Sequence, residues 1–259
     1  MGRLAAKTVS ANFMNLAPAL PVSLVALGYL ILPLALVVEG SFGSSEAGFH
    51  RGGSTLTLLA LESICLALLP ALLATGLSTI ASLLGVFHPR FSKNYRKWLL
   101  VMLFTNPVFI VFGLSILLAR TPPHIAVVLA SSYVLMPFCG QIMQAGIGEF
   151  DLAQVRAARS LGATPLFIAV RHILPFVRQQ VIASVLLSAI YAFGFFLIPT
   201  YVGLGRTITL ATVIYTLTNT IGDWTAACQL CVVAIATQFV LVLLWICATH
   251  FSTASRGRS

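Results

Sequence analysis

Long apolar stretches separated by short polar segments dominate the pattern of this chain. Six of the stretches are long enough to cross the hydrocarbon core of a bilayer, which takes about 20 predominantly apolar residues. We expect these crossings at 17–38, 57–86, 98–119, 124–146, 177–200 and 224–250. The pattern therefore predicts an all-α membrane protein with six transmembrane helices.

Helix-breaking and small residues lie inside these stretches, as in the kinked and closely packed helices of membrane proteins. The helix breakers are Pro33, Pro70, Gly76, Pro107, Pro137 and Gly194. Small residues recur along 71–85, so we expect the second helix to pack closely against its neighbours. No small-residue cleavage site follows the first stretch, which is therefore expected to be a retained helix and not a signal peptide.

Composition excludes a soluble globular protein. Only 8% of the residues are charged and 59% are apolar, whereas a soluble domain carries about 25% charged residues. The formal charge of +9 comes from short basic clusters between apolar runs, and no basic stripe with interleaved aromatics indicates nucleic-acid binding. Four of the five cysteines lie well inside apolar runs. Cys228 and Cys231 are three residues apart and would share a helix face, which a metal or redox site could use, but no histidine or second cysteine pair lies near them, so we expect packing contacts and no bound metal or cofactor.

The distribution of charge predicts the orientation. With both termini in the cytoplasm, twelve of the fifteen basic residues fall on cytoplasmic segments, and only Arg51, Arg120 and Arg206 remain outside. Cytoplasmic loops carry such an excess of Lys and Arg. We expect a cytoplasmic segment at 1–16, a transmembrane domain at 17–250 and a cytoplasmic tail at 251–259. Within the outer segment 201–223, residues 207–215 read as a re-entrant or interfacial helix.

The cytoplasmic segment 149–176 carries the most local structure. Asp151 and Gln154 predict a capping box that opens a helix through Leu161, and Gly162 supplies a left-handed residue that ends it. Thr164 and Pro165 then predict a second short helix, which Leu174–Pro175 is expected to break. The result is a rigid protruding pair of short helices on the cytoplasmic side.

This segment resembles the signature of the inner-membrane permeases of bacterial binding-protein-dependent ABC importers. That signature reads Glu-Ala-Ala, three residues, Gly, nine residues, then Ile-x-Leu-Pro. Here Ala157–Ala158, Ser160–Ala163 and Leu174–Pro175 match in register. Two positions depart from it, because Arg156 replaces the acid and His172 stands at the Ile position. Short motifs elsewhere are similar to the polyamine-type permeases and to the related ferric-iron, thiamine and phosphonate systems: Ser41–Phe42, Thr105–Pro107, Met136–Phe138 and Gly222–Trp224.

The resemblance implies that the segment is the coupling helix, which inserts into a groove of the ATPase. The coupling residues implied in this chain are Gln154, Arg156, Ala157, Ala158, Gly162, Ala163 and Pro175. It further implies three partners besides lipid: an ATPase dimer with ATP and magnesium, a second permease subunit that we expect to be a different chain, and a periplasmic solute-binding protein. The implied location is the bacterial inner membrane.

Polar residues at membrane depth are candidates for the substrate pathway. They are Glu62, Asn106, Gln141, Tyr191 and Asp223. Interhelical hydrogen bonding or an interfacial position would explain each of them equally well, and packing is an alternative for the aromatic run from Tyr191 to Phe196. An acidic outer side favours a small cation such as a polyamine or amino-acid-like amine.

The chain contains no Gly-x-x-x-x-Gly-Lys motif, so we expect a non-catalytic subunit whose nucleotide is bound by another chain. Two other classes remain as alternatives. An intramembrane enzyme would require paired acids or a histidine cluster at depth, and the five histidines are scattered. An ion-coupled secondary transporter would usually show internal repeats and buried carboxylates.

Overall fold

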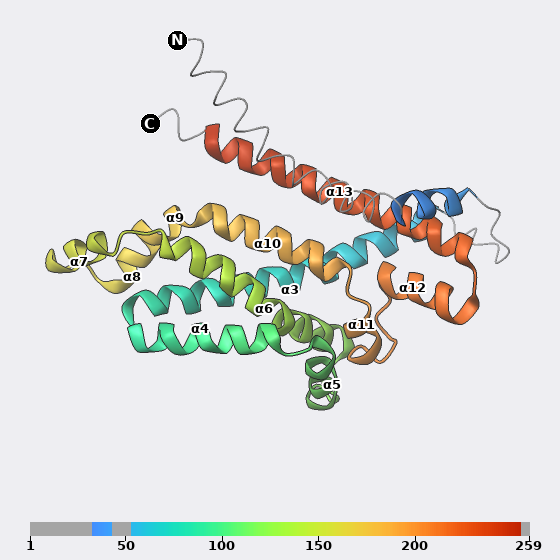
Figure 1. The fold of residues 1–259 in the computed structure, drawn as a ribbon, viewed down its shortest axis with the longest axis horizontal. Coiled ribbons are helices and arrows are strands. Elements are labelled where there is room, and N and C mark those ends of the chain that lie inside the picture. The colour runs from blue at the N-terminus through green and yellow to red at the C-terminus, as the bar shows by residue number, and fades with distance from the viewer. Residues whose placement is uncertain (1–32, 43–52, 255–259) are drawn as a thin grey trace, which may run out of the picture.

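The computed structural model describes residues 33–42 and 53–254, and this part of the chain consists of helices joined by turns and short connections, with no strand. Its long helices are α3 (Gly53–Phe87), α4 (Pro89–Phe104), α6 (Pro123–Gly148), α10 (Arg178–Phe193) and α13 (Trp224–Ala254). They run roughly along the longest axis of the molecule (Figure 1). The expectation of an all-α protein is therefore confirmed for the described residues.

The centre of the bundle is α3, which packs against α6, α10 and α4. Small residues permit these close contacts, because Ala71, Ala74 and Ser78 on α3 are fully buried, as expected from the sequence. Gly76 is different, since a Cβ there would meet nothing within 4 Å. At the other side, α13 contacts α10 and α12 (Leu210–Thr216) and then diverges from the bundle (Figure 1).

Two helices meet the length and hydropathy of a membrane crossing without interruption. They are residues Thr57–Phe87 of α3 and Pro123–Gly148 of α6, close to the expected crossings at 57–86 and 124–146. The helix α13 begins at the expected residue, Trp224. The first expected crossing, 17–38, lies mostly outside the described residues. The part of the chain that is described there, 33–42, is helical from residue 33 to residue 41.

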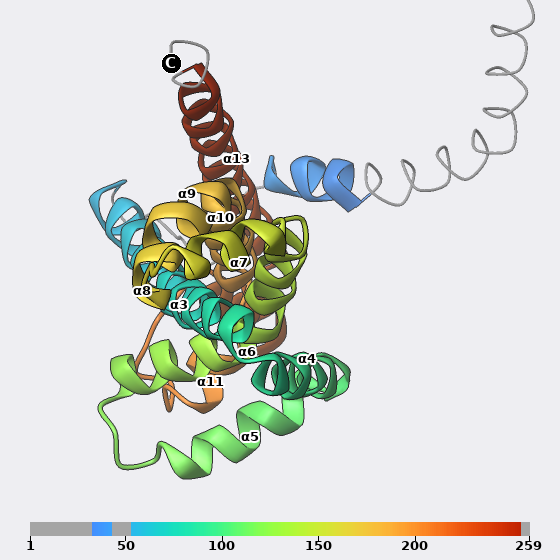
Figure 2. The ribbon, with the colours of Figure 1, turned by 90° about the vertical axis from the view of Figure 1, so that its left-hand side faces the viewer.

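The expected crossing at 98–119 is wrong as a single helix. The helix α4 begins earlier, at Pro89, and the chain bends by 102° at Thr105–Asn106 before α5 (Pro107–Leu117). A proline disfavours α conformation in the residue before it, and Asn106 is extended, with its side chain accepting the N–H of Val108 at 3.0 Å. As a result α5 lies across the bundle direction, as Figure 2 shows. The basic residues 90–97 are exposed on the first half of α4 and not in a loop.

The expected crossing at 177–200 is also interrupted. The helix α10 ends at Phe193, Gly194 caps it, and the chain continues in the five-residue α11 (Leu197–Tyr201). The short helix expected at 207–215 is present as α12, which a π-helical turn η2 (Leu217–Ile221) extends. A capping box between Thr209 and Thr212 begins α12, and the Ser63 hydroxyl of α3 accepts the N–H of Leu210 at 2.9 Å. This end of the chain is thereby fastened to α3.

Candidate functional site

The segment 149–176, called here the knuckle, projects from one end of the bundle (Figure 1). Its first helix is α7 (Leu152–Ser160), and Asp151 is the N-cap, as expected. The carboxylate accepts the N–H of Ala153 at 2.8 Å. This is one residue earlier than the N–H of Gln154 that a capping box would use. The cap is therefore present in a simpler form than the sequence predicted.

The bend after α7 is a Schellman motif, as Gly162 predicted. Gly162 has a φ of +84°, its N–H donates to the carbonyl of Arg159 at 2.9 Å, and the N–H of Ala163 donates to that of Ala158 at 3.1 Å. These two bonds satisfy carbonyls that the end of a helix leaves unpaired. A Cβ at Gly162 would meet no atom within 4 Å, so the backbone conformation alone demands glycine here.

The second half of the knuckle begins as expected and ends differently. Thr164 caps α8 (Pro165–Ile168) and accepts the N–H of Phe167. The chain then passes through a π-helical turn, η1 (Ala169–Ile173), and continues through Pro175 in α9 (Leu174–Phe176). The expected break at Leu174–Pro175 is therefore wrong. A π-turn changes the bonding register next to the proline, which cannot donate an N–H. The 68° bend comes instead after Phe176, at Val177.

A small core fixes the knuckle to the bundle. It consists of Phe150, Val155, Ile168, Ile173 and Val177, packed against residues at the ends of α3, α6 and α10. Ala158 and Ala163 join this core, so these two candidate coupling residues contribute to the knuckle's own packing. In addition, the Arg159 guanidinium lies 5.2 Å from the ring centroid of Phe87 at the end of α3. The knuckle is thus rigidly attached.

The outer face of the knuckle is apolar and open, which sequence reasoning missed. Leu161 is 88% exposed, and Leu166, Phe167 and Val170 are also exposed. Exposed apolar patches of this kind mark interaction surfaces. The signal was present in the sequence, because Leu161 precedes the turning glycine and the other three occupy one side of a short helix after Pro165. Gln154, Arg156, Ala157 and Pro175 are exposed as well.

Two of the five pathway candidates are helix caps. Asn106 caps α5, as described above. Asp223 precedes Trp224, the first residue of α13, and its carboxylate accepts the N–H of Ala226 at 3.0 Å. Gly222, with a φ of +80°, makes the turn before it. Local structure therefore accounts for both side chains.

The other three candidates lie on three separate helices. Glu62 is exposed on α3, next to the buried Ser63, and Gln141 is half-buried on α6. Tyr191 is 48% exposed on α10, with its ring centroid 5.0 Å from that of Phe138 and 5.2 Å from that of Phe195. Glu62, Gln141 and Tyr191 thus lie on α3, α6 and α10, which pack against one another. The described residues also contain no group of three His, Cys, Asp or Glu that could hold a metal ion.

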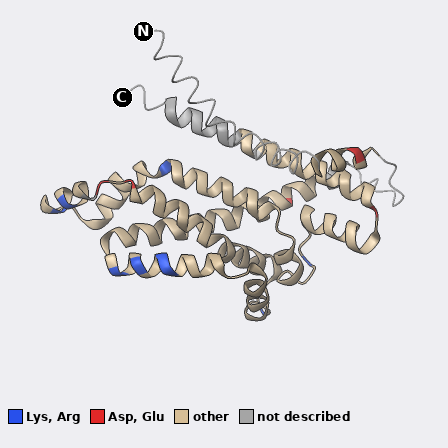
Figure 3. Cartoon of the chain, viewed as in Figure 1, with Lys and Arg blue, Asp and Glu red and all other residues tan. Residues whose placement is uncertain are grey.

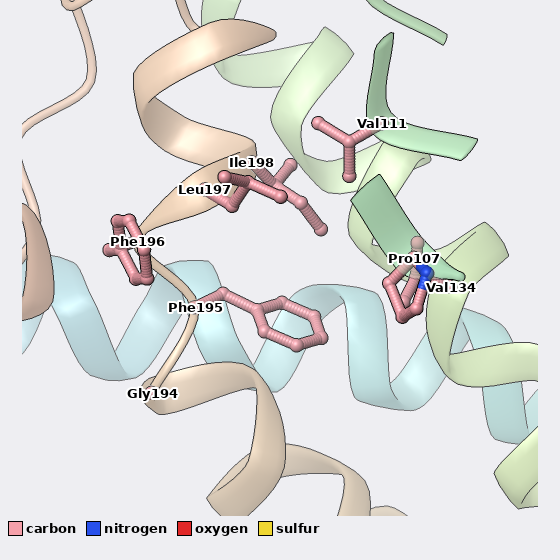
Figure 4. Close-up of a pocket in the computed structure, with 8 residues that line it drawn as sticks. All are labelled: Pro107, Val111, Val134, Gly194, Phe195, Phe196, Leu197 and Ile198. Carbon is pink, nitrogen blue, oxygen red and sulfur yellow. The ribbon is translucent and has the colours of Figure 1, made fainter. Parts of the chain in front are cut away.

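An apolar cavity of about 150 Å³ lies where the two interrupted crossings meet. Pro107 comes from the break between α4 and α5, and Gly194, Phe195 and Phe196 come from the break after α10 (Figure 4). The ring of Phe195 points toward the cavity from the chain between α10 and α11 (Figure 4). Both helix breaks therefore border the same cavity.

Basic residues gather at the knuckle end of the bundle. Figure 3 shows them on α4, α7 and the start of α10. Among the described residues, eight of the ten Lys and Arg lie between Arg90 and Lys97 or between Arg156 and Arg178, and the other two are Arg120 and Arg206. These two follow α5 and α11, which lie away from the knuckle end (Figure 1). The bundle is therefore strongly polarised in charge.

The sequence profile of the family described as "binding-protein-dependent transport system inner membrane component" matches residues 77–254. The spermidine/putrescine transport system permease protein PotB of Escherichia coli (strain K12) is 29% identical over 146 residues, which cover 49% of this chain and 53% of that protein. PotB of Salmonella typhimurium (strain LT2) is 26% identical over 168 residues, covering 57% and 58%. The chain thus spans little more than half the length of the curated relatives it matches.

Solved structures share the fold at low sequence identity. The crystal structure of a bacterial alginate ABC transporter, in complex with an alginate pentasaccharide-bound periplasmic protein, has a TM-score of 0.69 at 15% identity, covering 92% of this chain and 94% of that one. The inward-facing MetNI methionine ABC transporter has a TM-score of 0.59 at 15% identity, covering 74% and 95%.

Proposed function

Because the chain belongs to the family of binding-protein-dependent transport system inner membrane components, we propose that it forms half of the pathway of an ABC importer for a small amine of the polyamine class. A second permease subunit supplies the other half, and an ATPase dimer binds ATP and magnesium. A periplasmic binding protein delivers the solute. Transport follows alternating access, in which closure of the ATPase dimer moves the knuckles and tilts the helices.

The knuckle is the observation that carries this proposal. Its attachment to α3, α6 and α10 through one small core makes it a lever on those helices. Its apolar outer face, with Leu161 almost wholly exposed, suits a groove on another protein and has no use in water. Five coupling candidates stay exposed and would face the same partner: Gln154, Arg156, Ala157, Gly162 and Pro175.

The charge polarity supports a topology with the knuckle in the cytoplasm. An excess of Lys and Arg marks the cytoplasmic side of a membrane protein, and the knuckle end holds most of the described basic residues. Six crossings with both termini in the cytoplasm agree with this polarity. In this arrangement α5 and α12 lie toward the periplasmic side of the inner membrane, where the binding protein docks.

Arg156 tests the docking surface. It is exposed on α7, and in the family this position carries an acid, so the facing groove is expected to be acidic or rich in carbonyls. Arg156→Glu should weaken co-purification with the ATPase by about tenfold, because an attraction becomes a repulsion. The measurement is the amount of ATPase retained on tagged permease across a salt series.

Lys93→Glu is the matched control, since Lys93 is exposed on α4 at the same end of the bundle but outside the knuckle. It should retain the ATPase like the wild type. Equal retention of the ATPase by Arg156→Glu and by the wild type would remove the electrostatic argument, and a charge reversal on the ATPase should restore a weakened complex.

Uptake measurements test the substrate class. PotB is a permease protein of a spermidine/putrescine transport system. In addition, acids prevail at the end opposite the knuckle, where a cation would enter. The wild-type importer should accumulate labelled putrescine or spermidine in proteoliposomes supplied with ATP, even with an uncoupler present. Uptake that stops with the uncoupler would indicate an ion-coupled carrier, and an importer that accepts only iron, thiamine or phosphonate would correct the substrate.

Glu62 separates an entrance role from an interfacial one. It is exposed within the stretch that forms the second crossing, where topology does not require an acid. Glu62→Gln should raise the KM for amines by about threefold to tenfold, through loss of one carboxylate along the approach. An unchanged KM would leave Glu62 as an interfacial acid without a role in transport.

A further inference from the structure

Aromatic side chains line one surface at the outer part of α10, in contact with α6 and α12. Phe138 of α6 and Tyr191 of α10 pack with ring centroids 5.0 Å apart, and Tyr191 also contacts Phe195 at 5.2 Å. Phe196 and Tyr215 stack with centroids 4.9 Å apart and planes within 16°. Four of these rings stay partly exposed: Phe138, Tyr191, Phe196 and Tyr215. Phe193, which lies between Tyr191 and Phe195 in the sequence, is only 4% exposed. The packing therefore buries Phe193 and leaves two groups of accessible rings, one around Phe138 and Tyr191 and one formed by Phe196 and Tyr215.

Two cavities are lined in part by these rings. One of about 270 Å³ is lined by Leu135, Phe138, Leu187, Ser188, Ile190 and Tyr191. The other, of about 150 Å³, is the cavity at the helix breaks, lined in part by Phe195 and Phe196 (Figure 4). Phe195 joins them, because it contacts Tyr191 and also lines the second cavity. The combined volume of the two cavities lies near the lower end of the range of about 300–1,000 Å³ that is typical of small-ligand sites.

The depth of Tyr191 argues against a surface covered by lipid alone. Tyr191 lies 13 residues along α10 from Arg178, or about 20 Å at 1.5 Å per residue, so it falls within the about 30 Å of the hydrocarbon core. A hydroxyl facing acyl chains there would lack a hydrogen-bonding partner at a free-energy cost. Ser188 also borders the larger cavity, but it is buried and its hydroxyl is hydrogen-bonded to the Cys139 thiol at 2.9 Å. The Tyr191 hydroxyl is therefore the polar group that this surface presents, and the surface suits a chain that is apolar along its length and polar at its ends.

The walls of both cavities carry no formal charge. Neither 125–148 nor 179–205 contains a Lys, Arg, His, Asp or Glu, and these ranges supply all of the lining except Pro107 and Val111. An anion would find no counter-charge here and would face the negative side of the rings. An ammonium group is attracted to the faces of Tyr and Phe, while an alkyl chain fills the apolar space. The chemistry fits an alkylammonium ion.

We propose that Phe138, Tyr191, Phe196 and Tyr215 form an aromatic track that conducts an alkylammonium substrate across the membrane and selects it over anions. This inference rests on the proposed function and assigns its selectivity to particular rings. The track passes the substrate from ring to ring without a carboxylate that would hold it too tightly for release. The proposed occupant of the track is the amine itself. The experiment must exclude two other occupants, a lipid chain and a side chain of the second permease.

The test is amine uptake by the assembled importer, purified through a tag on this chain and reconstituted with its binding protein. Labelled putrescine and spermidine are the probes. Tyr191→Leu and Phe138→Leu should each raise the KM for uptake about tenfold, because each removes a ring face. Tyr191→Phe keeps the ring and should stay within about twofold of the wild type. Binding-protein-stimulated ATP hydrolysis should persist in all three variants.

Tyr133→Leu is the matched control. Tyr133 lies on α6 and is 39% exposed, its ring packs against Trp98, and it lines neither cavity. This variant should take up amines like the wild type. Unchanged KM values in Tyr191→Leu and Phe138→Leu, with or without loss of thermal stability, would show that lipid or the partner permease covers the rings. An equal defect in Tyr133→Leu or in Tyr191→Phe would also overturn the track. If the wild type takes up no amine, the proposed substrate class fails and the track fails with it.

Discussion

Replacing Gly162 by valine should uncouple ATP hydrolysis from uptake while membrane insertion stays normal. The φ of +84° at Gly162 is a left-handed conformation that costs a residue with a Cβ about 1–2 kcal/mol. For a β-branched residue such as valine, the cost lies at the upper end of this range. A change of this size alters the ratio of two conformations about 5- to 30-fold. The two Schellman hydrogen bonds would then open, and the apolar face around Leu161 would leave its position relative to the bundle.

A graded series makes this prediction sharp. Asparagine tolerates the left-handed region, so Gly162→Asn should transport almost normally, Gly162→Ala should be intermediate, and Gly162→Val should lose most uptake. Since a Cβ at this position meets no atom within 4 Å, the order follows backbone strain and not side-chain size. The measurements are uptake and ATP hydrolysis of the reconstituted complex. Normal transport by Gly162→Val would show that the knuckle is not the coupling element.

Replacing Gly140 by valine should destabilise the bundle itself. Gly140 lies on α6, opposite α4, and a Cβ there would approach the Leu99 methyl groups to 2.6 and 2.7 Å and the Tyr95 hydroxyl to 3.0 Å. Leu99 is completely buried and has nowhere to move. Overpacking of this kind costs about 1–3 kcal/mol, so the Tm of the purified chain should fall by about 3–10 °C.

Gly76→Val provides the control, because a Cβ at Gly76 meets open space. Its melting temperature should match that of the wild type. Leu99→Ala should partly restore the stability of Gly140→Val, since it removes the methyl groups that the new side chain strikes. A Gly140→Val chain that melts like the wild type, or a double variant less stable than either single one, would contradict the close crossing of α4 and α6.

Local sequence determined the knuckle almost completely. Asp151 begins its first helix, Gly162 turns the chain and Thr164–Pro165 begins the second helix, as the residues predicted. Each of these features depends on hydrogen bonds between residues two to five positions apart, so the nearest neighbours in sequence suffice to specify them. The apolar stretches of α3 and α6 were predictable for a similar reason, because length and hydropathy alone mark a crossing.

Tertiary packing decided what the prolines and the glycine of the long apolar runs do. Pro107 follows a break of 102°, Pro175 is carried through by a π-turn, and α10 ends at Gly194. Pro70 and Pro137, by contrast, lie inside continuous helices. The missing N–H of a proline is the same in each case, so its local preference cannot distinguish a break from a tolerated kink. At Pro107 the extended Asn106 caps the helix that follows the break. Pro70 and Pro137 lie instead in α3 and α6, which pack against each other and against α10, and packed helices tolerate such prolines.

The same limit applies to the aromatic run. The sequence favours core packing for the aromatic run of Tyr191, Phe193, Phe195 and Phe196, with a pathway role as the alternative, and does not distinguish one ring from another. The structure buries Phe193 against α3, α6 and α13 and leaves Tyr191 and Phe196 beside cavities. Sequence thus determined that the chain has helices long and apolar enough to cross a membrane and a segment of two short helices joined by a turn at Gly162. Only the contacts between helices distant in sequence decided which rings face inward, because burial depends on partners that local residues do not specify.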